Sequence, residues 1–142
     1  MNKPQIVIDT CVLVSALRSS RGASYRLLEV IDSDKFDVNI SVPLVLEYEE
    51  ACTRHLEHLG LTAADLKVVL DYICRVSHHR AVSYLWRPLL DDPDDDMVLE
   101  LAVAASCSHL VSFNRADFRQ AIEFGIQVVG PKEFLMEIGE LK

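Results

Sequence analysis

The sequence lacks the patterns that mark several large function classes. Its four cysteines include no C-x-x-C pair, which argues against zinc-binding and thioredoxin-like chemistry. No glycine-rich phosphate loop is present, and no apolar stretch approaches the length of a membrane-spanning helix. Positive charge is scarce: 14 lysines and arginines stand against 22 acidic residues, and the net charge of −8 argues against wrapping nucleic acid by bulk electrostatics. The first apolar run is short, so we expect no signal peptide and a reduced, cytoplasmic protein.

What the chain does contain is an alternation of strand-like and helix-like segments. Its 142 residues, 50% of them hydrophobic, suffice for one core, and we expect a single domain over residues 1–142. Apolar or alternating runs predict strands at 6–8, 36–42, 82–85, 110–112 and 127–129. Helical spacing predicts helices at 12–17, 24–31, 43–59, 62–76, 97–105 and 115–124, and a closing helix after 130–131. Such alternation predicts an α/β fold, a three-layer α/β/α sandwich around a mostly parallel sheet.

Four acid or amide residues fall where this fold would bring them together. Asp9 ends the first strand and Asn114 follows a later one, while Glu47 and Asp96 lie in the first turns of helices. Because parallel strands all end at the same edge of a sheet, we expect these residues to converge there. Carboxylates crowded at one edge call for a hard divalent cation, and oxygen ligands select Mg²⁺ or Mn²⁺. The sequence therefore predicts a metal site at this edge.

Each of these acids also has a purely structural explanation. Asp9 is placed to cap the following helix, although Thr10 is a suitable cap too and would leave Asp9 free. Asp94 and Asp96 are placed to stabilise a helix N-terminus through the helix macrodipole. Capping accounts for one or two acids, however, and aspartates stand at positions 91, 92, 94, 95 and 96. This excess favours metal binding by at least one member of the run.

Other metal chemistries fit the sequence less well. An EF-hand loop starting at Asp92 would need Gly where Met97 stands and Glu where Val103 stands. A metal-dependent phosphotransfer domain usually carries D-x-D after its first strand, and here Asp9 is followed by Thr10 and Cys11. The five histidines offer no set of metal ligands.

Three stretches of the sequence form a recognisable combination. They are VIDTCVLVSAL at residues 7–17, DPDDD at 92–96 before an apolar helix, and LVSFNRADF at 110–118. Asp96 and Asn114 are 114 − 96 = 18 positions apart. The combination resembles PIN domains, and within that family the toxin components of toxin–antitoxin systems. The resemblance covers nearly the whole chain.

The resemblance implies a metal-dependent ribonuclease that acts on single-stranded RNA. It assigns Asp9, Glu47 and Asp96 as acids that hold Mg²⁺ or Mn²⁺, and Asn114 as the fourth ligand. One metal would lower the pKa of a bound water, a second would stabilise the leaving oxygen, and Glu47 is the candidate acceptor of the water's proton. Supporting positions beside these ligands are Thr10 and Ser112.

Two residues depart from the family's usual motif. Cys11 stands where an asparagine usually helps to orient the first aspartate. Asn114 stands where relatives often have aspartate, and it brings no charge to a second metal. Acids placed to compensate are Asp92, Asp94 and Asp117.

The partners that the resemblance implies are RNA, an antitoxin protein and a second copy of the chain in a homodimer, with no membrane. Backbone phosphates are bound by cationic side chains, and Arg18, Arg21 and Arg115 are the arginines nearest in sequence to the predicted edge. The sequence is equally consistent with these three being ordinary surface arginines. The departures at Cys11 and Asn114 leave an alternative open. In it, the chain is a catalytically weak PIN-like module that binds a protein or RNA.

Overall fold

A five-stranded, wholly parallel sheet organises the computed structural model, which describes residues 3–82 and 93–141. The strand order is β3-β2-β1-β4-β5, and each neighbouring pair runs parallel. The strands are β1 (Gln5–Ile8), β2 (Asp37–Ile40), β3 (His78–His79), β4 (His109–Val111) and β5 (Gln127–Val129). Because β1 lies between β2 and β4, the residue after its last position sits at the middle of the carboxyl edge.

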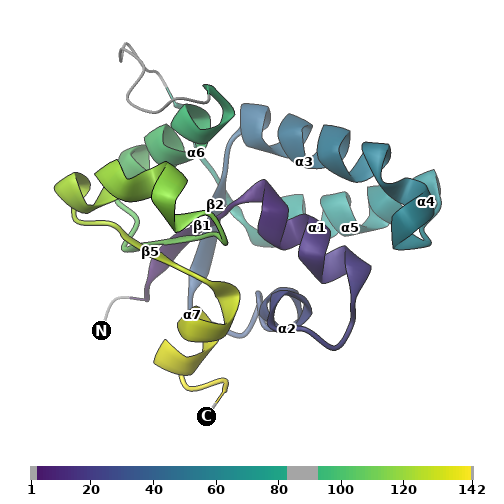
Figure 1. The fold of residues 1–142 in the computed structure, drawn as a ribbon, viewed down its shortest axis with the longest axis horizontal. Coiled ribbons are helices and arrows are strands. Elements are labelled where there is room, and N and C mark those ends of the chain that lie inside the picture. Colours follow the sequence, from purple (N-terminus) through teal and green to yellow (C-terminus); the bar gives the residue numbers. More distant parts are fainter. Residues whose placement is uncertain (1–2, 83–92, 142) are drawn as a thin grey trace.

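Helices cover both faces of this sheet, as Figure 1 shows for α6 on one side and α1, α2 and α7 on the other. This arrangement confirms the predicted three-layer α/β/α fold and follows from right-handed crossovers between parallel strands. The helices are α1 (Thr10–Arg18), α2 (Ala23–Glu29), α3 (Val42–Arg54), α4 (Leu56–Leu59), α5 (Ala63–Val76), α6 (Pro93–Ala104), the 3₁₀ helix η1 (Arg115–Phe124) and α7 (Pro131–Glu137).

The core lies between these layers and explains the apolar runs of the sequence. Ile6 and Val7 of β1 are fully buried, as expected for the central strand of a covered sheet. Helix α6 was expected to be buried because it is apolar almost all round, and Leu99, Leu101 and Ala102 are each 0% exposed. Helix α6 contacts β1, β2, β4 and α3. These contacts fix the position of its acidic N-terminal end relative to the sheet.

The predicted continuous helix over 43–59 is wrong in one respect, because it breaks at His55. The backbone there leaves the helical region at φ −113° and ψ 14°, and α3 ends where the short α4 begins. After this break, Leu59 packs into the core. Helix α4 ends at Gly60, whose φ of 67° is in the left-handed region that favours glycine.

The other helix and strand predictions have simpler outcomes. Thr62 and Asp65 form the expected capping box, with hydrogen bonds of 3.1 and 2.9 Å between side chains and backbone amides. The strand expected at 82–85 lies outside the described residues except for Val82, which is not in a strand. In the described part of the chain, no helix is long and apolar enough to cross a membrane.

Candidate active site

Asp9 is the buried carboxylate at the centre of the carboxyl edge. It follows β1, is 6% exposed, and caps α1 by accepting a hydrogen bond from the Thr10 amide at 2.9 Å. Its second oxygen accepts a hydrogen bond from the Ser112 hydroxyl at 2.7 Å. Of the two caps that the sequence left open, Asp9 and Thr10, the structure has Asp9. The Thr10 hydroxyl is itself buried without a hydrogen-bond partner among the described residues.

The electrostatic state of Asp9 indicates a site that lacks positive charge. Burial raises the pKa of Asp9 above its ordinary value, and the charge of Asp117 raises it further. Hydrogen bonds from Ser112, Cys11 and Thr10 lower the pKa, but they do not outweigh burial. No cation contributes to its environment among these causes. A buried carboxylate held above its usual pKa is a position that a bound cation would stabilise.

Ser112 and Asn114 reach Asp9 from the neighbouring strand. Strands β1 and β4 pair with Ile8 opposite Val111, so the residues that follow each strand meet at the same edge. Ser112 is 0% exposed, and its hydroxyl oxygen also accepts a hydrogen bond from the Asn114 amide at 2.9 Å. The Asn114 side chain is exposed, so it is available to a ligand or substrate.

Cys11 contributes its thiol to the site. Its thiol donates to Asp9 at 3.5 Å and lies 3.9 Å from the Ser112 hydroxyl and 3.8 Å from the Asn114 side-chain amide. Burial, followed by the charge of Asp9, raises the pKa of Cys11 to about 11. The thiol therefore stays protonated near neutral pH and orients Asp9 as a neutral donor.

Glu47 is brought toward this edge by the residue that follows it. The hydroxyl of Tyr48 is buried and donates to the carbonyl of Ile8, the last residue of β1. The charge of Asp9 contributes to raising the pKa of Tyr48, after burial as the main cause. This contact fixes the first turns of α3 beside the end of β1, which Asp9 follows. Glu47 lies in these turns and is half-buried.

Helix α6 carries Asp96, which was predicted as a ligand, and Glu100, which was not. Asp96 is half-buried, and Glu100 one turn later is 8% exposed with one carboxylate oxygen lacking a hydrogen-bond partner among the described residues. Burial, and then the charge of Asp96, raise the pKa of Glu100. The signal in the sequence was a single acid four positions after Asp96 within an apolar helix.

The described side chains do not assemble the predicted metal ligands around one point. Among the described residues, no three His, Cys, Asp or Glu side chains are grouped so that they would hold a metal ion. Asp92 and the side chain of Asp94 lie outside the described part. The all-oxygen donors, the unpartnered oxygen of Glu100 and the raised pKa of Asp9 nevertheless fit a divalent cation.

Comparison with known proteins identifies the family. A model of the PIN domain family matches residues 5–116 of the chain. The chain belongs to the PIN domain family. Its PIN domain is similar in fold to a chain of VapBC2 from Rickettsia felis, solved bound to a DNA fragment from their promoter. The TM-score is 0.62 at 14% identity, over 89% of this chain and 98% of that chain. A search of curated proteins found no match. PIN domains are generally nucleases and typically use divalent metal ions.

The arginines of this PIN domain lie in different places. Arg18 and Arg21 are exposed at the far end of α1 from Asp9, about 12 Å along the helix axis at 1.5 Å per residue. Arg115 lies next to Asn114 and forms an ion pair with Glu133 of α7 at 3.1 Å. Of the three, Arg115 is thus the one that adjoins the site.

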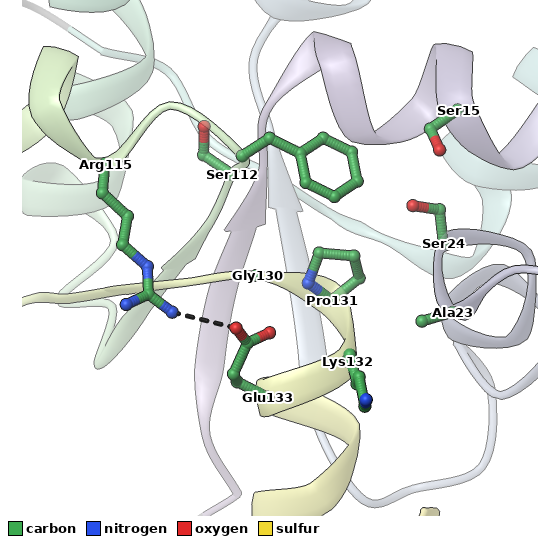
Figure 2. A pocket seen from close by; sticks show the side chains of 10 residues that line it. Ser15, Ala23, Ser24, Ser112, Arg115, Gly130, Pro131, Lys132 and Glu133 are labelled. Carbon is green, nitrogen blue, oxygen red and sulfur yellow. Dashed lines mark hydrogen bonds and ion pairs between the residues drawn. The ribbon is translucent and has the colours of Figure 1, made fainter.

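A cavity of about 280 Å³ opens beside the Asp9 site of the PIN domain. Ser112, which holds Asp9, also lines this cavity, and Figure 2 shows Arg115 and Glu133 at the left and lower centre of the view and Ser15 and Ser24 at the right. The cavity could not be predicted from the sequence, because its walls come from segments that are distant in the sequence.

Proposed function

We propose that this PIN domain hydrolyses phosphodiester bonds of single-stranded RNA with the help of Mg²⁺ or Mn²⁺. The observation that carries the proposal is the buried Asp9 carboxylate, whose pKa is raised at the carboxyl edge of a fold whose family members are generally nucleases. The acids that would hold the metal are Asp9, Glu47 and Asp96, and Asn114 would add an amide oxygen. Asp92, Asp94 and Asp117 are further candidates, and the buried oxygen of Glu100 makes it another.

The residues of the chain would perform distinct parts of the reaction. The bound metal would supply a water of lowered pKa and neutralise charge on the phosphate. Ser112 and Cys11 fix the rotamer of Asp9 through hydrogen bonds of 2.7 and 3.5 Å, so this ligand is oriented before the substrate arrives. Glu47 is our candidate for accepting a proton from the attacking water, because Tyr48 anchors its helical turn to the end of β1.

We further propose that the protein is the toxin of a toxin–antitoxin pair and acts in the cytoplasm as a single domain over residues 1–142. The support is the fold similarity to a chain of VapBC2, which was solved with promoter DNA. An antitoxin protein and a homodimer are the partners that follow. Co-expression with the product of an adjacent small reading frame, followed by size-exclusion chromatography, tests for both.

A catalytically weak binding module is the alternative. It is favoured by one observation, the replacement of the usual acid by Asn114, whose side-chain amide nitrogen faces the Cys11 sulfur at 3.8 Å. Such a module would bind RNA or a protein without cutting it.

A nuclease assay separates these functions. Wild type should cleave single-stranded RNA in the presence of Mn²⁺ and lose cleavage in EDTA. Asp9→Asn should lose at least about 10- to 100-fold, the loss typical of residues that support metal ligands. The Asn side chain can still cap α1, so this variant tests the charge and not the fold. Equal cleavage by both proteins, or none by wild type, would refute the hydrolytic role.

A further inference from the structure

The cavity beside Ser112 is lined by aromatic, hydroxyl and cationic side chains that metal binding does not require. Its walls come from α1, α2, the loop after β4 and the start of α7 (Figure 2). Its volume of about 280 Å³ is close to the lower end of the roughly 300–1,000 Å³ typical of sites for small organic molecules. A single nucleotide is a ligand of suitable size.

One wall of the cavity offers an aromatic surface. Phe113 lines the cavity and remains 52% exposed, although it lies directly between the buried Ser112 and the exposed Asn114. Pro131, on the first turn of α7, adds a second apolar surface. Exposed aromatic rings beside a nuclease site are the usual platforms on which unpaired bases of single strands stack.

The opposite wall offers two serine hydroxyl groups. Ser24 is only 3% exposed and lines the cavity. Ser15 is half-buried, and Figure 2 shows its hydroxyl and that of Ser24 directed toward the same space. These hydroxyls fit the donors and acceptors on the edge of a nucleobase.

Positive charge stands at the rim of the cavity. Lys132 is exposed and forms no ion pair among the described residues, whereas Lys3, Lys35 and Lys67 are each paired with acids. In a chain with a net charge of −8, such an uncompensated ammonium group beside the candidate active site is suited to a backbone phosphate.

From these observations we infer that the cavity is a subsite for one nucleotide of single-stranded RNA, adjacent to the bond that is cut. The base would stack on Phe113, its edge would meet the hydroxyls of Ser15 and Ser24, and the neighbouring phosphate would contact Lys132. Because Ser112, Phe113 and Asn114 are consecutive, a base held on Phe113 places the next phosphate beside Asp9. This inference rests on the proposed RNA-cleaving function and names the part of the substrate that the site would recognise.

Binding without cleavage tests the subsite. We would measure fluorescence anisotropy of labelled oligo(A), oligo(C) and oligo(U) RNA in EDTA, with oligo(dA) and oligo(dT) as DNA arms. The variants are Phe113→Ala, the conservative Phe113→Trp, and Ser24→Ala. Phe124→Ala is the matched control, since Phe124 is also an exposed phenylalanine and does not line the cavity. Thermal melts establish that each variant is folded.

We expect Phe113→Ala to weaken RNA binding by about 10-fold, the order that one stacked base contributes, and Phe113→Trp to restore it. Ser24→Ala should reduce the differences in affinity among the three RNA bases. Affinity for RNA unchanged in Phe113→Ala relative to the Phe124→Ala control would overturn the subsite, as would wild type that binds none of the RNA oligonucleotides or binds DNA more tightly.

The two proposals fail in different ways. If wild type binds RNA through Phe113 but does not cleave it with Mn²⁺, the hydrolytic function fails and the subsite stands. If RNA is cleaved but Phe113→Ala changes neither affinity in EDTA nor KM with Mn²⁺, the subsite fails and the nuclease stands. If Phe113→Ala instead releases only a co-expressed protein partner, the cavity is a protein-binding site and the nucleotide subsite is refuted.

Discussion

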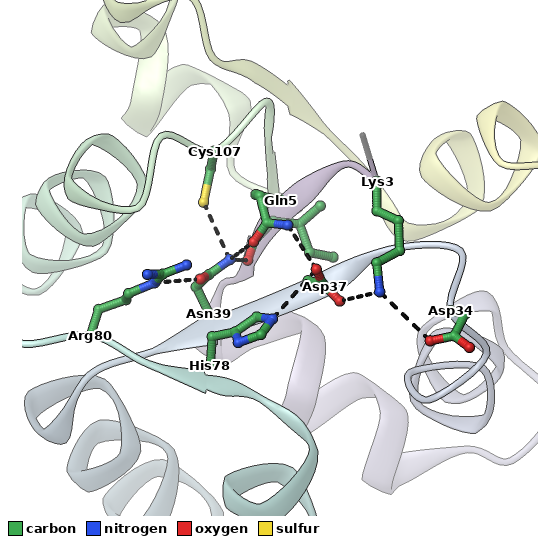
Figure 3. A network of polar contacts seen from close by, with 9 residues as sticks. Lys3, Gln5, Asp34, Asp37, Asn39, His78, Arg80 and Cys107 are labelled. Carbon is green, nitrogen blue, oxygen red and sulfur yellow. Dashed lines mark hydrogen bonds and ion pairs between the residues drawn. The ribbon is translucent and has the colours of Figure 1, made fainter. Parts of the chain in front are cut away.

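Asp37 at the amino edge of the sheet and Asp9 at its carboxyl edge are both aspartates at strand ends, but their surroundings differ. Asp37 accepts hydrogen bonds or ion pairs from Gln5 at 2.8 Å, Lys3 at 3.0 Å and His78 at 3.4 Å (Figure 3). Partial burial raises the pKa of Asp37, but the bonds from Gln5 and Lys3 outweigh it and lower the pKa overall. Asp9, in contrast, has neutral donors only, and its pKa is raised.

Buried polar groups follow this division only in part. At the amino edge, Asn39 is 0% exposed and fully used: its amide donates to Gln5 and to the Ile6 carbonyl, and its oxygen accepts from Arg80 at 2.8 Å. At the carboxyl edge, the Thr10 hydroxyl and one oxygen of Glu100 have no partner among the described residues, and the same holds for the Ser77 hydroxyl directly before β3 at the amino edge. Satisfied networks fix a fold, whereas uncompensated groups collect where a protein binds something. The network around Asp37 and Asn39 therefore stabilises the fold, whereas the buried Asp9 carboxylate lacks a cationic partner among the causes of its raised pKa.

The largest expected difference between the edges is their response to divalent metal. A ligand that binds only the native state at 100 times its Kd raises the free energy of unfolding by about 2.7 kcal/mol. We expect Mn²⁺ to approach this for wild type and for Asp37→Asn, and to have no effect on Asp9→Asn. Urea denaturation with and without Mn²⁺ measures it, and a wild-type midpoint unmoved by millimolar Mn²⁺ would remove the metal from the carboxyl edge.

The two edges should also respond to pH with opposite sign when metal is absent. The pKa of Asp9 is raised, so the native state retains its proton longer than the unfolded chain, and stability falls as pH rises from 3.8 through the native pKa. The pKa of Asp37 is lowered, so its contribution is present above pH 3.8 and is lost as pH falls through the native pKa.

Substitution separates these two slopes. In Asp9→Asn, the free energy of unfolding should decrease less as pH rises above 3.8. In Asp37→Asn, it should decrease less as pH falls below 3.8. Because the Asp37 side chain is partly solvated, its slope should correspond to about 1 kcal/mol or less. Chemical denaturation over pH 2.5–7 in EDTA measures both, and slopes of the same sign at the two edges would contradict the comparison.

The fold was predictable from the sequence because its signals are local. The apolar run 6–8, the capping residues Thr62 and Asp65, and the continuous apolar surface of α6 each determine one element, and the rule of parallel crossovers arranges them. The break at His55 was not predictable, because the stripe of apolar residues continues across it and only tertiary packing of Leu59 decides where the helix turns.

The candidate site was predictable only in part. The topology places Asp9, Ser112 and Asn114 at one edge, but side-chain partners depend on contacts across about a hundred positions of sequence. The contacts of the Cys11 thiol with Asp9 and Asn114 are such a case, because only the structure gives their distances. Glu100 was hidden for the same reason, since an acid within an apolar helix becomes informative only when its burial is known.

The smallest expected effect, and the finest distinction, concerns Asn114. Replacing Asn114 with aspartate adds a negative charge to the carboxyl edge, where Asp9 has no cationic partner. Because the side chain at position 114 is exposed, the new carboxylate stays solvated. If Asn114 is the fourth ligand, Asn114→Asp should tighten Mn²⁺ binding by about fivefold, as expected for one added charge near a solvated surface, and raise cleavage at limiting metal. Asp96→Asn should do the opposite, because it removes charge from the same edge.

A different outcome would give Asn114 a different role. Its backbone amide is fixed by Ser112 and its neighbour Phe113 lines the cavity, so its side chain is equally placed to position substrate. In that case aspartate would repel the phosphate, and Asn114→Asp would lower cleavage at saturating Mn²⁺ by raising KM. Titrating cleavage against Mn²⁺ and against RNA separates the two, because a ligand changes the dependence on metal and a positioning residue the dependence on RNA. Unchanged dependence on Mn²⁺ in Asn114→Asp would remove this residue from the metal site and leave the acids of α3 and α6 to complete it.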